Sequence, residues 1–205
     1  SQCDLEFLLH SGPPLGHDRL ILFGSLLSLL YFLILLLFFD VIKVLEGIYD
    51  KYLLKDIKDL LRLATDNELD RLGKFLAGQI GNIIKYQELA GACGLNFKEL
   101  KKHLNILNKT YIISLVPPFF TNKRTELVKN PKVYFNDLGL RNYSIADWRA
   151  AGVRNDLGSL AENYGFILLE KIFGGQLKYW RTKAKAEVDF IITREQSAYP
   201  LEIKY

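Results

Sequence analysis

The chain has 205 residues, of which 49% are hydrophobic and 24% are charged, so it is expected to be globular, with room for one large domain or two small ones. The net charge of +4 permits an anionic partner without requiring one. Two isolated cysteines, Cys3 and Cys93, argue against a disulfide framework and a zinc site, so a reducing, cytoplasmic compartment is expected. No methionine is present, even at position 1, which favours a fragment of a longer protein.

A hydrophobic segment lies within residues 1–40. Residues 20–39 carry no charge, and a run of this length can cross a hydrocarbon core of about 30 Å. The flanking charges give no orientation bias, and the features of a signal peptide are missing. Two alternatives stay open for this segment: a membrane helix, or a buried segment of a soluble protein.

Four amphipathic helices are expected next. Apolar spacing predicts a connecting helix over residues 41–64, and Thr65 begins a capping box that opens a second helix ending near Gly81. A third helix covers residues 86–93, and Asn96 caps a fourth that runs to about residue 108. The short third helix, the glycine turn and the longer fourth helix form a helix-turn-helix pattern.

Two β-rich runs, residues 111–116 and 132–136, flank a proline-bearing loop after this pattern. The order predicts a winged helix-turn-helix domain over residues 65–145. Three aromatic residues of this region are interpreted as packing residues rather than base-stacking ones: Tyr111, Phe119 and Phe120.

Basic residues dominate the same region. Between Lys98 and Lys132 there are eight basic residues and two acidic ones, which predicts contacts to DNA phosphates with little choice of sequence. The alternative is a solvated basic face on a winged helix that contacts protein. The residues assigned to DNA are Lys98, Lys101, Lys102, Lys123 and Arg124.

The C-terminal part combines a helix with three β-runs. Residues 154–173 predict a helix that carries Glu162 and has one apolar stripe; β-runs follow at residues 177–182, 186–193 and 199–205. The stripe consists of Leu160, Tyr164, Leu168 and Ile172.

If the last two runs form a hairpin, Asp189 lies near the same end as Glu202 and Lys204. Two carboxylates and a carbonyl oxygen favour Mg²⁺ or Mn²⁺, and a lysine beside them can activate water. The alternative is the ordinary alternation of charges on a half-exposed strand.

The segments "EVDFII" and "PLEIK" resemble the PD-(D/E)xK nuclease-like superfamily. Together with "LAGQIGN", "NPKVYFNDLGLRN" and "YWRTKAKAEVDFI", they resemble the C-terminal region of archaeal and bacterial AAA-type ATPases, over residues 49–205. The resemblance implies a mixed α/β fold, with the winged helix followed by a restriction-endonuclease-like domain at residues 150–205. It also implies that Glu162 is the helix acid, Asp189 the first-strand metal ligand, and Glu202 and Lys204 the ExK pair.

The resemblance places Arg181 and Lys183 in a WRTK segment, where they either face phosphates or keep a strand edge soluble. No GxxxxGK[ST] motif is present, so no nucleotide site and no ATPase activity are assigned to the chain. The chain ends one residue after Lys204, where the nuclease-like fold would add a helix and a strand, so this domain is expected to be incomplete.

The expected function is therefore Mg²⁺-dependent hydrolysis of DNA phosphodiesters. The alternative is a catalytically silent regulatory module that binds DNA or protein. DNA is the expected partner, while a homo-oligomer and membrane attachment through residues 20–39 stay open.

Overall fold

The structure is a computed structural model that describes residues 17–51, 66–182, 184, 186–194 and 197–204. The chain divides into two compact units, residues 1–44 and residues 45–205. Helices are combined with two small antiparallel sheets, so the predicted mixed α/β class is confirmed.

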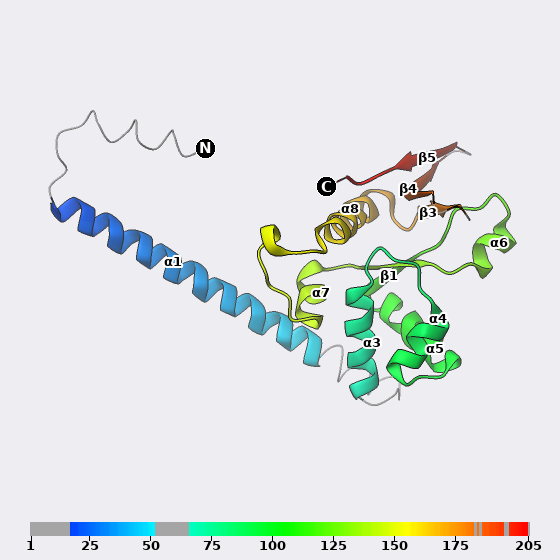
Figure 1. Ribbon diagram of the computed structural model, residues 1–205, viewed down its shortest axis with the longest axis horizontal. Helices are drawn as coiled ribbons and strands as arrows, with labels where there is room; N and C mark the ends of the chain where they lie inside the picture. Colours follow the sequence, from blue (N-terminus) through cyan, green and yellow to red (C-terminus); the bar gives the residue numbers. More distant parts are fainter. Residues whose placement is uncertain (1–16, 52–65, 183, 185, 195–196, 205) are drawn as a thin grey trace. The chain divides into compact units, whose positions relative to one another are not determined.

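The hydrophobic segment lies in one uninterrupted helix, α1 (His17–Glu46), drawn in blue in Figure 1. Large apolar side chains between Leu30 and Val44 are exposed along it. Among the described residues, no helix meets the length and hydropathy required for crossing a membrane. A π-helical turn follows at residues 47–51; most of the predicted connecting helix, and the Thr65 cap, fall outside the described ranges.

Three helices begin the described core of the second unit: α3 (Asp66–Gly78), α4 (Tyr86–Cys93) and α5 (Phe97–Lys109). The start of α5 is fixed by a reciprocal cap: the Glu99 N–H donates to Asn96 Oδ1 at 2.9 Å, and the Asn96 N–H donates to Glu99 Oε2 at 3.0 Å. Gly94 ends α4 in the left-handed conformation that glycine tolerates best. The apolar faces of the three helices share one core, which includes Leu72, Leu76, Leu89, Leu100 and Leu104.

A two-stranded antiparallel sheet follows, made of β1 (Ile113–Val116) and β2 (Lys132–Phe135). The loop between them contains a short helix, α6 (Lys123–Val128), whose first turn is capped by the Asn122 side chain. This helix was not predicted, since the segment was expected to be a proline-bearing loop. Tyr111 is 82% exposed, so its interpretation as a core residue is wrong.

The second edge of β2 is also occupied. Ile83 forms an antiparallel bridge with Lys132, and the Gly81 N–H donates to the Val133 carbonyl at 2.9 Å. The buried side chain of Asn163 accepts from the Phe135 N–H at 2.8 Å and donates to the Phe135 carbonyl at 2.7 Å. Asn163 therefore takes the place that a neighbouring strand would have.

The C-terminal part packs one helix on a sheet. After α7 (Leu138–Ser144) and a 3₁₀ turn (Ala151–Val153), α8 (Leu157–Phe173) precedes the antiparallel sheet β3 (Leu177–Arg181), β4 (Glu187–Arg194) and β5 (Ser197–Leu201). Their shared core contains Tyr134, Phe166, Phe190 and Ile192.

The buried face of α8 carries Asn163, Gly165 and Phe166. Most of the apolar stripe noted in the sequence, namely Tyr164, Leu168 and Ile172, is exposed instead.

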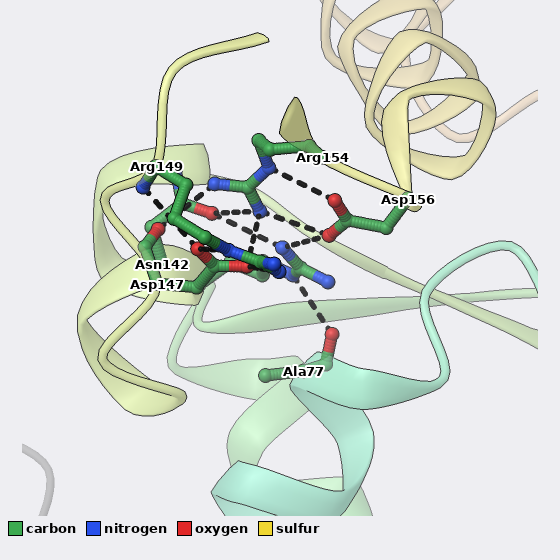
Figure 2. Close-up of polar contacts among 7 residues, drawn as sticks. Ala77, Asn142, Asp147, Arg149, Arg154 and Asp156 are labelled. Carbon is green, nitrogen blue, oxygen red and sulfur yellow. Dashed lines mark hydrogen bonds and ion pairs between the residues drawn. The ribbon is translucent and has the colours of Figure 1, made fainter. Parts of the chain in front are cut away.

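A network of arginines and carboxylates joins α3, α7 and the start of α8 (Figure 2). The Arg141 side chain is buried, and it donates to the Ala77 carbonyl at 2.8 Å and contacts Asp156 at 2.7 Å. Arg154 binds both oxygens of Asp156 at 2.9 Å, and Arg149 binds both oxygens of Asp147 at 2.9 Å. Because Asp156 directly precedes α8, the network fixes where that helix begins and so positions Glu162.

These ion pairs should make the second unit less stable at low pH. The guanidinium of Arg154 lowers the pKa of Asp156 to about 2, and Arg149 holds the pKa of Asp147 below its usual range. A lowered pKa contributes stability that is complete above the unfolded value of about 3.9 and is lost as the pH falls toward the folded value. We expect Asp156→Asn to lose about 1–2 kcal/mol of unfolding free energy at neutral pH, less than the full shift implies because solvent partly reaches the site.

The measurement is urea denaturation between about pH 5 and pH 2. The wild-type chain should lose more stability over this range than Asp156→Asn does. Glu88→Gln, which removes an exposed carboxylate of α4, is the matched control and should follow the wild-type curve. Parallel curves for Asp156→Asn and the wild type would contradict the expectation.

Candidate functional site

A bulge in β4 sets the directions of the acidic side chains at the C-terminal sheet. Lys178 of β3 lies opposite Ile191, but Trp180 lies opposite Val188, so two residues of β4, Asp189 and Phe190, face the single residue Tyr179. A bulge of this kind interrupts the regular alternation and redirects nearby side chains.

A buried lysine lies at the centre of the acidic residues. The side chain of Lys132 is 1% exposed, and its Nζ lies 2.9 Å from Glu162 Oε1 and 2.5 Å from Glu187 Oε1. The ammonium also lies 5.7 Å from the centre of the Tyr179 ring. The cluster thus joins β2, α8 and β4, which come from three separate parts of the chain, and its two carboxylates balance a charge that could not be buried alone.

Tyr134 completes the surroundings of Glu162. Its hydroxyl donates to Glu162 Oε1 at 2.5 Å, and its ring stacks on Phe166 with centroids 4.7 Å apart. Burial, followed by the nearby charge of Glu162, raises the pKa of Tyr134 far above its usual value, so the phenol stays a proton donor. The charges of Asp189 and Glu187 raise the pKa of Tyr134 further.

Gly81 leaves room for this arrangement. Its φ is +75°, and a Cβ at this position would come within 3.0 Å of Glu162 Oε2. A side chain here would therefore be strained and would push the Glu162 carboxylate from its place.

The remaining predicted residues lie at the end of the sheet. Phe190 pairs with Leu201, the last residue of β5, and Glu202 directly follows that strand. The Asp189 carboxylate accepts from the Ile203 N–H at 2.8 Å. Glu202 pairs with Lys204 at 3.3 Å, with side chains that are 50% and 85% exposed.

The structure places the predicted site residues in separate contacts. Glu162 accepts a hydrogen bond from Tyr134 and Asp189 accepts one from the Ile203 N–H, whereas Glu202 and Lys204 interact with each other at the surface. In the described part of the chain, no three His, Cys, Asp or Glu side chains are grouped so that they could hold a metal ion. The residues as placed do not form a complete ligand set for Mg²⁺, since Glu162 contacts the Lys132 ammonium instead.

The basic residues assigned to DNA are mostly exposed. Lys98, Lys101 and Lys102 are exposed on α5, as are Lys123 and Arg124 on α6. Lys101 Nζ lies 4.8 Å from the centre of the Phe97 ring.

Two further predicted contacts, Arg181 and Lys183, belong to the WRTK segment. Arg181 is exposed and pairs with Glu187 at 3.4 Å, while Lys183 lies outside the described residues. Lys132 was counted with the basic residues of the surface, but its side chain is buried and unavailable to phosphate.

The sequence reasoning missed the roles of Lys132, Tyr134 and Glu187. A signal was present: Lys132 and Tyr134 are two residues apart in a β-run, so their side chains share one face of β2. A lysine and a tyrosine on the buried face of a strand require hydrogen-bonding or charged partners, and Glu162 and Glu187 are the partners in the structure.

Two known families match consecutive parts of the chain, and the boundary between the two matches lies near the arginine network. Residues 40–151 match the family described as "Domain of unknown function (DUF8612)", which is more than half of the chain. The chain belongs to this family. In this DUF8612 chain, residues 157–205 also match "Domain of unknown function (DUF4143)", which is typically associated with AAA-type ATPases.

Two curated relatives of the DUF8612 chain come from mycobacteria. They are the "Uncharacterized protein Rv2008c" of Mycobacterium tuberculosis and the "Uncharacterized protein Mb2031c" of Mycobacterium bovis, each 26% identical over 162 residues. The match covers 78% of this chain and 37% of each relative, so the chain spans well under half of their length. No solved structure matches the chain significantly.

The buried lysine can be tested by removing its charge. Lys132→Met leaves Glu162 and Glu187 close together without a cation between them. Breaking a buried ion pair in this way is expected to lower the unfolding free energy by about 3–5 kcal/mol, measured by urea denaturation.

The matched control is Lys129→Met, which removes an exposed lysine and should change stability by less than about 0.5 kcal/mol. Adding Glu162→Gln to Lys132→Met should recover part of the loss, because it removes one of the two carboxylate charges that Lys132 had balanced. A Lys132→Met chain as stable as the wild type would show that the ammonium does not stabilise this cluster.

Proposed function

We propose that this chain is the DNA-binding region of a cytoplasmic, prokaryotic protein of the AAA-type ATPase group. In this proposal residues 65–145 form a winged helix-turn-helix domain, and residues 150–205 form a nuclease-like domain. The observation that carries it is the exposed basic side of α5, the second helix of a helix-turn-helix.

The order of elements supports the winged helix. The helices α3, α4 and α5 precede an antiparallel pair, β1 and β2, and Ile83 adds a third strand position beside Lys132. In DNA-binding proteins with a helix-turn-helix, the second helix enters the major groove. The helix α5 has this place in the chain, with Leu100, Leu104 and Leu107 buried against the core.

The charge on the opposite side of α5 supports DNA as the partner. Lys98, Lys101 and Lys102 are exposed there, and Glu99 is engaged in the capping box. Lysines contribute affinity through phosphate contacts and make binding dependent on salt. The AAA-type association of the C-terminal match supports the wider assignment, in which an ATPase module lies elsewhere in a longer protein.

Charge reversal on α5 tests the DNA-binding role. Lys98→Glu combined with Lys102→Glu should weaken binding to a labelled duplex roughly tenfold or more and reduce the slope of log affinity against log salt by about one per lost contact. The control is Lys171→Glu, which reverses an exposed charge on α8. Lys178 is not used as a control because it forms an ion pair with Glu126.

Fluorescence anisotropy over a series of salt concentrations gives both quantities. Lys171→Glu should bind duplex DNA within about twofold of the wild type. If the α5 variant binds as tightly as the control, α5 does not contact DNA and the proposal fails.

A second candidate function is the Mg²⁺-dependent hydrolysis predicted from the sequence. It is favoured by the hydrogen bond from the Ile203 N–H to the Asp189 carboxylate, which ties Asp189 to the segment that carries Glu202 and Lys204. In this candidate Asp189 and Glu202 would hold the metal, Lys204 would lie beside the phosphate, and Glu162 would support them from α8. The ion pair between Glu162 and Lys132 opposes a direct role for Glu162.

A cleavage assay with branched and linear DNA, in the presence of Mg²⁺ or Mn²⁺, tests this candidate. It compares the wild type with the test variant Asp189→Ala and with the control variant Glu170→Ala. Glu170→Ala is the control, since Glu170 lies on α8 away from the sheet end. Hydrolysis should fall at least a hundredfold in Asp189→Ala and persist in Glu170→Ala. Equal cleavage by both variants, or none by the wild type, would eliminate the candidate.

A further inference from the structure

Two hollows lie side by side along the segment that follows α6. One, of about 880 Å³, is lined by residues 128–130 together with the end of β3, including Trp180, Arg181 and Thr182. The other, of about 640 Å³, is lined by the same residues 128–130 together with Tyr86, Phe97 and Lys101 from α4 and α5. We name the pair the basic–aromatic groove.

The charge of the groove is of one sign. Its described lining residues include the cations Lys85, Lys101, Lys129 and Arg181 and no carboxylate. Lys129, at the shared wall, is exposed. Lys85 pairs with Glu88 at 3.0 Å and Arg181 with Glu187 at 3.4 Å. A polyanion that runs from one hollow to the other would therefore meet Lys129 and Lys101 and would compete with carboxylates for the other two cations.

Aromatic side chains alternate with these cations. Trp180 is 37% exposed and Phe97 is 52% exposed, although both belong to types that normally prefer burial. The rings of Tyr86 and Phe97 lie edge to face at 5.7 Å. Flat rings presented beside lysines and arginines are the features on which unpaired bases stack while their phosphates are neutralised.

The walls of the groove are held in place. Lys178 of β3 binds Glu126 of α6 at 2.7 Å. Burial acts to raise the pKa of Glu126, but the hydrogen bond and charge of Lys178, together with the Phe120 N–H and Lys123, lower it on balance. The Tyr179 hydroxyl donates to the Asn130 carbonyl at 2.7 Å. The Phe119 N–H also donates to the Tyr179 carbonyl at 2.6 Å, so the loop that carries α6 is tied to β3 both before and after that helix.

We propose that the basic–aromatic groove binds single-stranded nucleic acid, with bases stacked on Trp180 and Phe97 and phosphates at Lys129 and Arg181. The inference deepens the proposed function, on which it rests for the identity of the partner as nucleic acid. A single strand fits better than a duplex, because the rings line hollows that only unpaired, flexible bases can enter. Arg181 also contacts Glu187 at 3.4 Å, so a strand in the groove ends beside the acidic cluster.

The test measures binding of labelled oligo(dT) and oligo(U) to the whole chain by fluorescence anisotropy. Trp180→Ala and Lys129→Glu should each weaken binding of the oligonucleotide roughly tenfold and leave duplex binding unchanged. Lys98→Glu combined with Lys102→Glu should show the opposite pattern. Comparison of the two oligonucleotides distinguishes DNA from RNA as the strand.

Tyr199→Ala and Lys171→Glu are the matched controls, because they remove an exposed aromatic ring and an exposed cation outside the groove. Tryptophan fluorescence supplies a second readout: titration with oligo(dT) should quench the wild-type signal, and Trp180→Phe should bind with most of this quenching lost.

Each outcome has one meaning. Oligonucleotide binding that survives Trp180→Ala and Lys129→Glu overturns the inference while leaving the role of α5 intact. Duplex binding that survives the α5 variant, with oligonucleotide binding still lost in Trp180→Ala, overturns the proposed duplex contact and retains the groove. Absence of oligonucleotide binding also overturns the inference, and the exposed Leu127 and Val128 beside the groove would then point to a protein partner.

Discussion

The buried ammonium of Lys132 is the interaction on which the second unit depends. It contacts Glu162 of α8 and Glu187 of β4, while its own strand, β2, pairs with β1. An unpaired charge at this depth would be strongly destabilising, so the helical part and the C-terminal sheet must come together with both carboxylates in place. The same contact engages Glu162, the carboxylate that the resemblance implied as the helix acid of the nuclease-like site. The assembly of the unit therefore limits what this carboxylate can do chemically.

The elements with local signals could be predicted well from the sequence. The helix α4 has the predicted ends, and α5 begins at the predicted Asn96 cap, because a capping box and a left-handed glycine depend on neighbouring residues alone. The helices α6 and α7 were missed, since each is short and begins after a cap, Asn122 or Asp137, in a segment whose prolines or turn residues suggested a loop. The apolar stripe of α8 predicted the wrong buried face. The buried face is the one that carries Phe166, which packs against residues from distant parts of the chain.

The candidate site could be predicted only in part, for a similar reason. Simple alternation would put Glu187 and Asp189 on one face of β4, but it cannot reveal the bulge opposite Tyr179, which depends on the pairing with β3. Lys132 was read as a surface cation because the partners that bury its charge lie in distant parts of the chain. Asp189 is tied to the segment that carries Glu202 by its hydrogen bond from the Ile203 N–H, and convergence of the two carboxylates on a metal stays a prediction.

The side chain of Asn163 has a consequence for how copies of this chain could associate. By satisfying both backbone groups of Phe135, it closes an edge of β2 that a strand from another molecule would otherwise extend. The described C-terminal sheet has β5 at one border, where Pro200 lacks an amide hydrogen and interrupts any added ladder. At these two edges the backbone is protected from pairing with a strand of another molecule, so copies of this chain that associate there would have to do so through side-chain contacts.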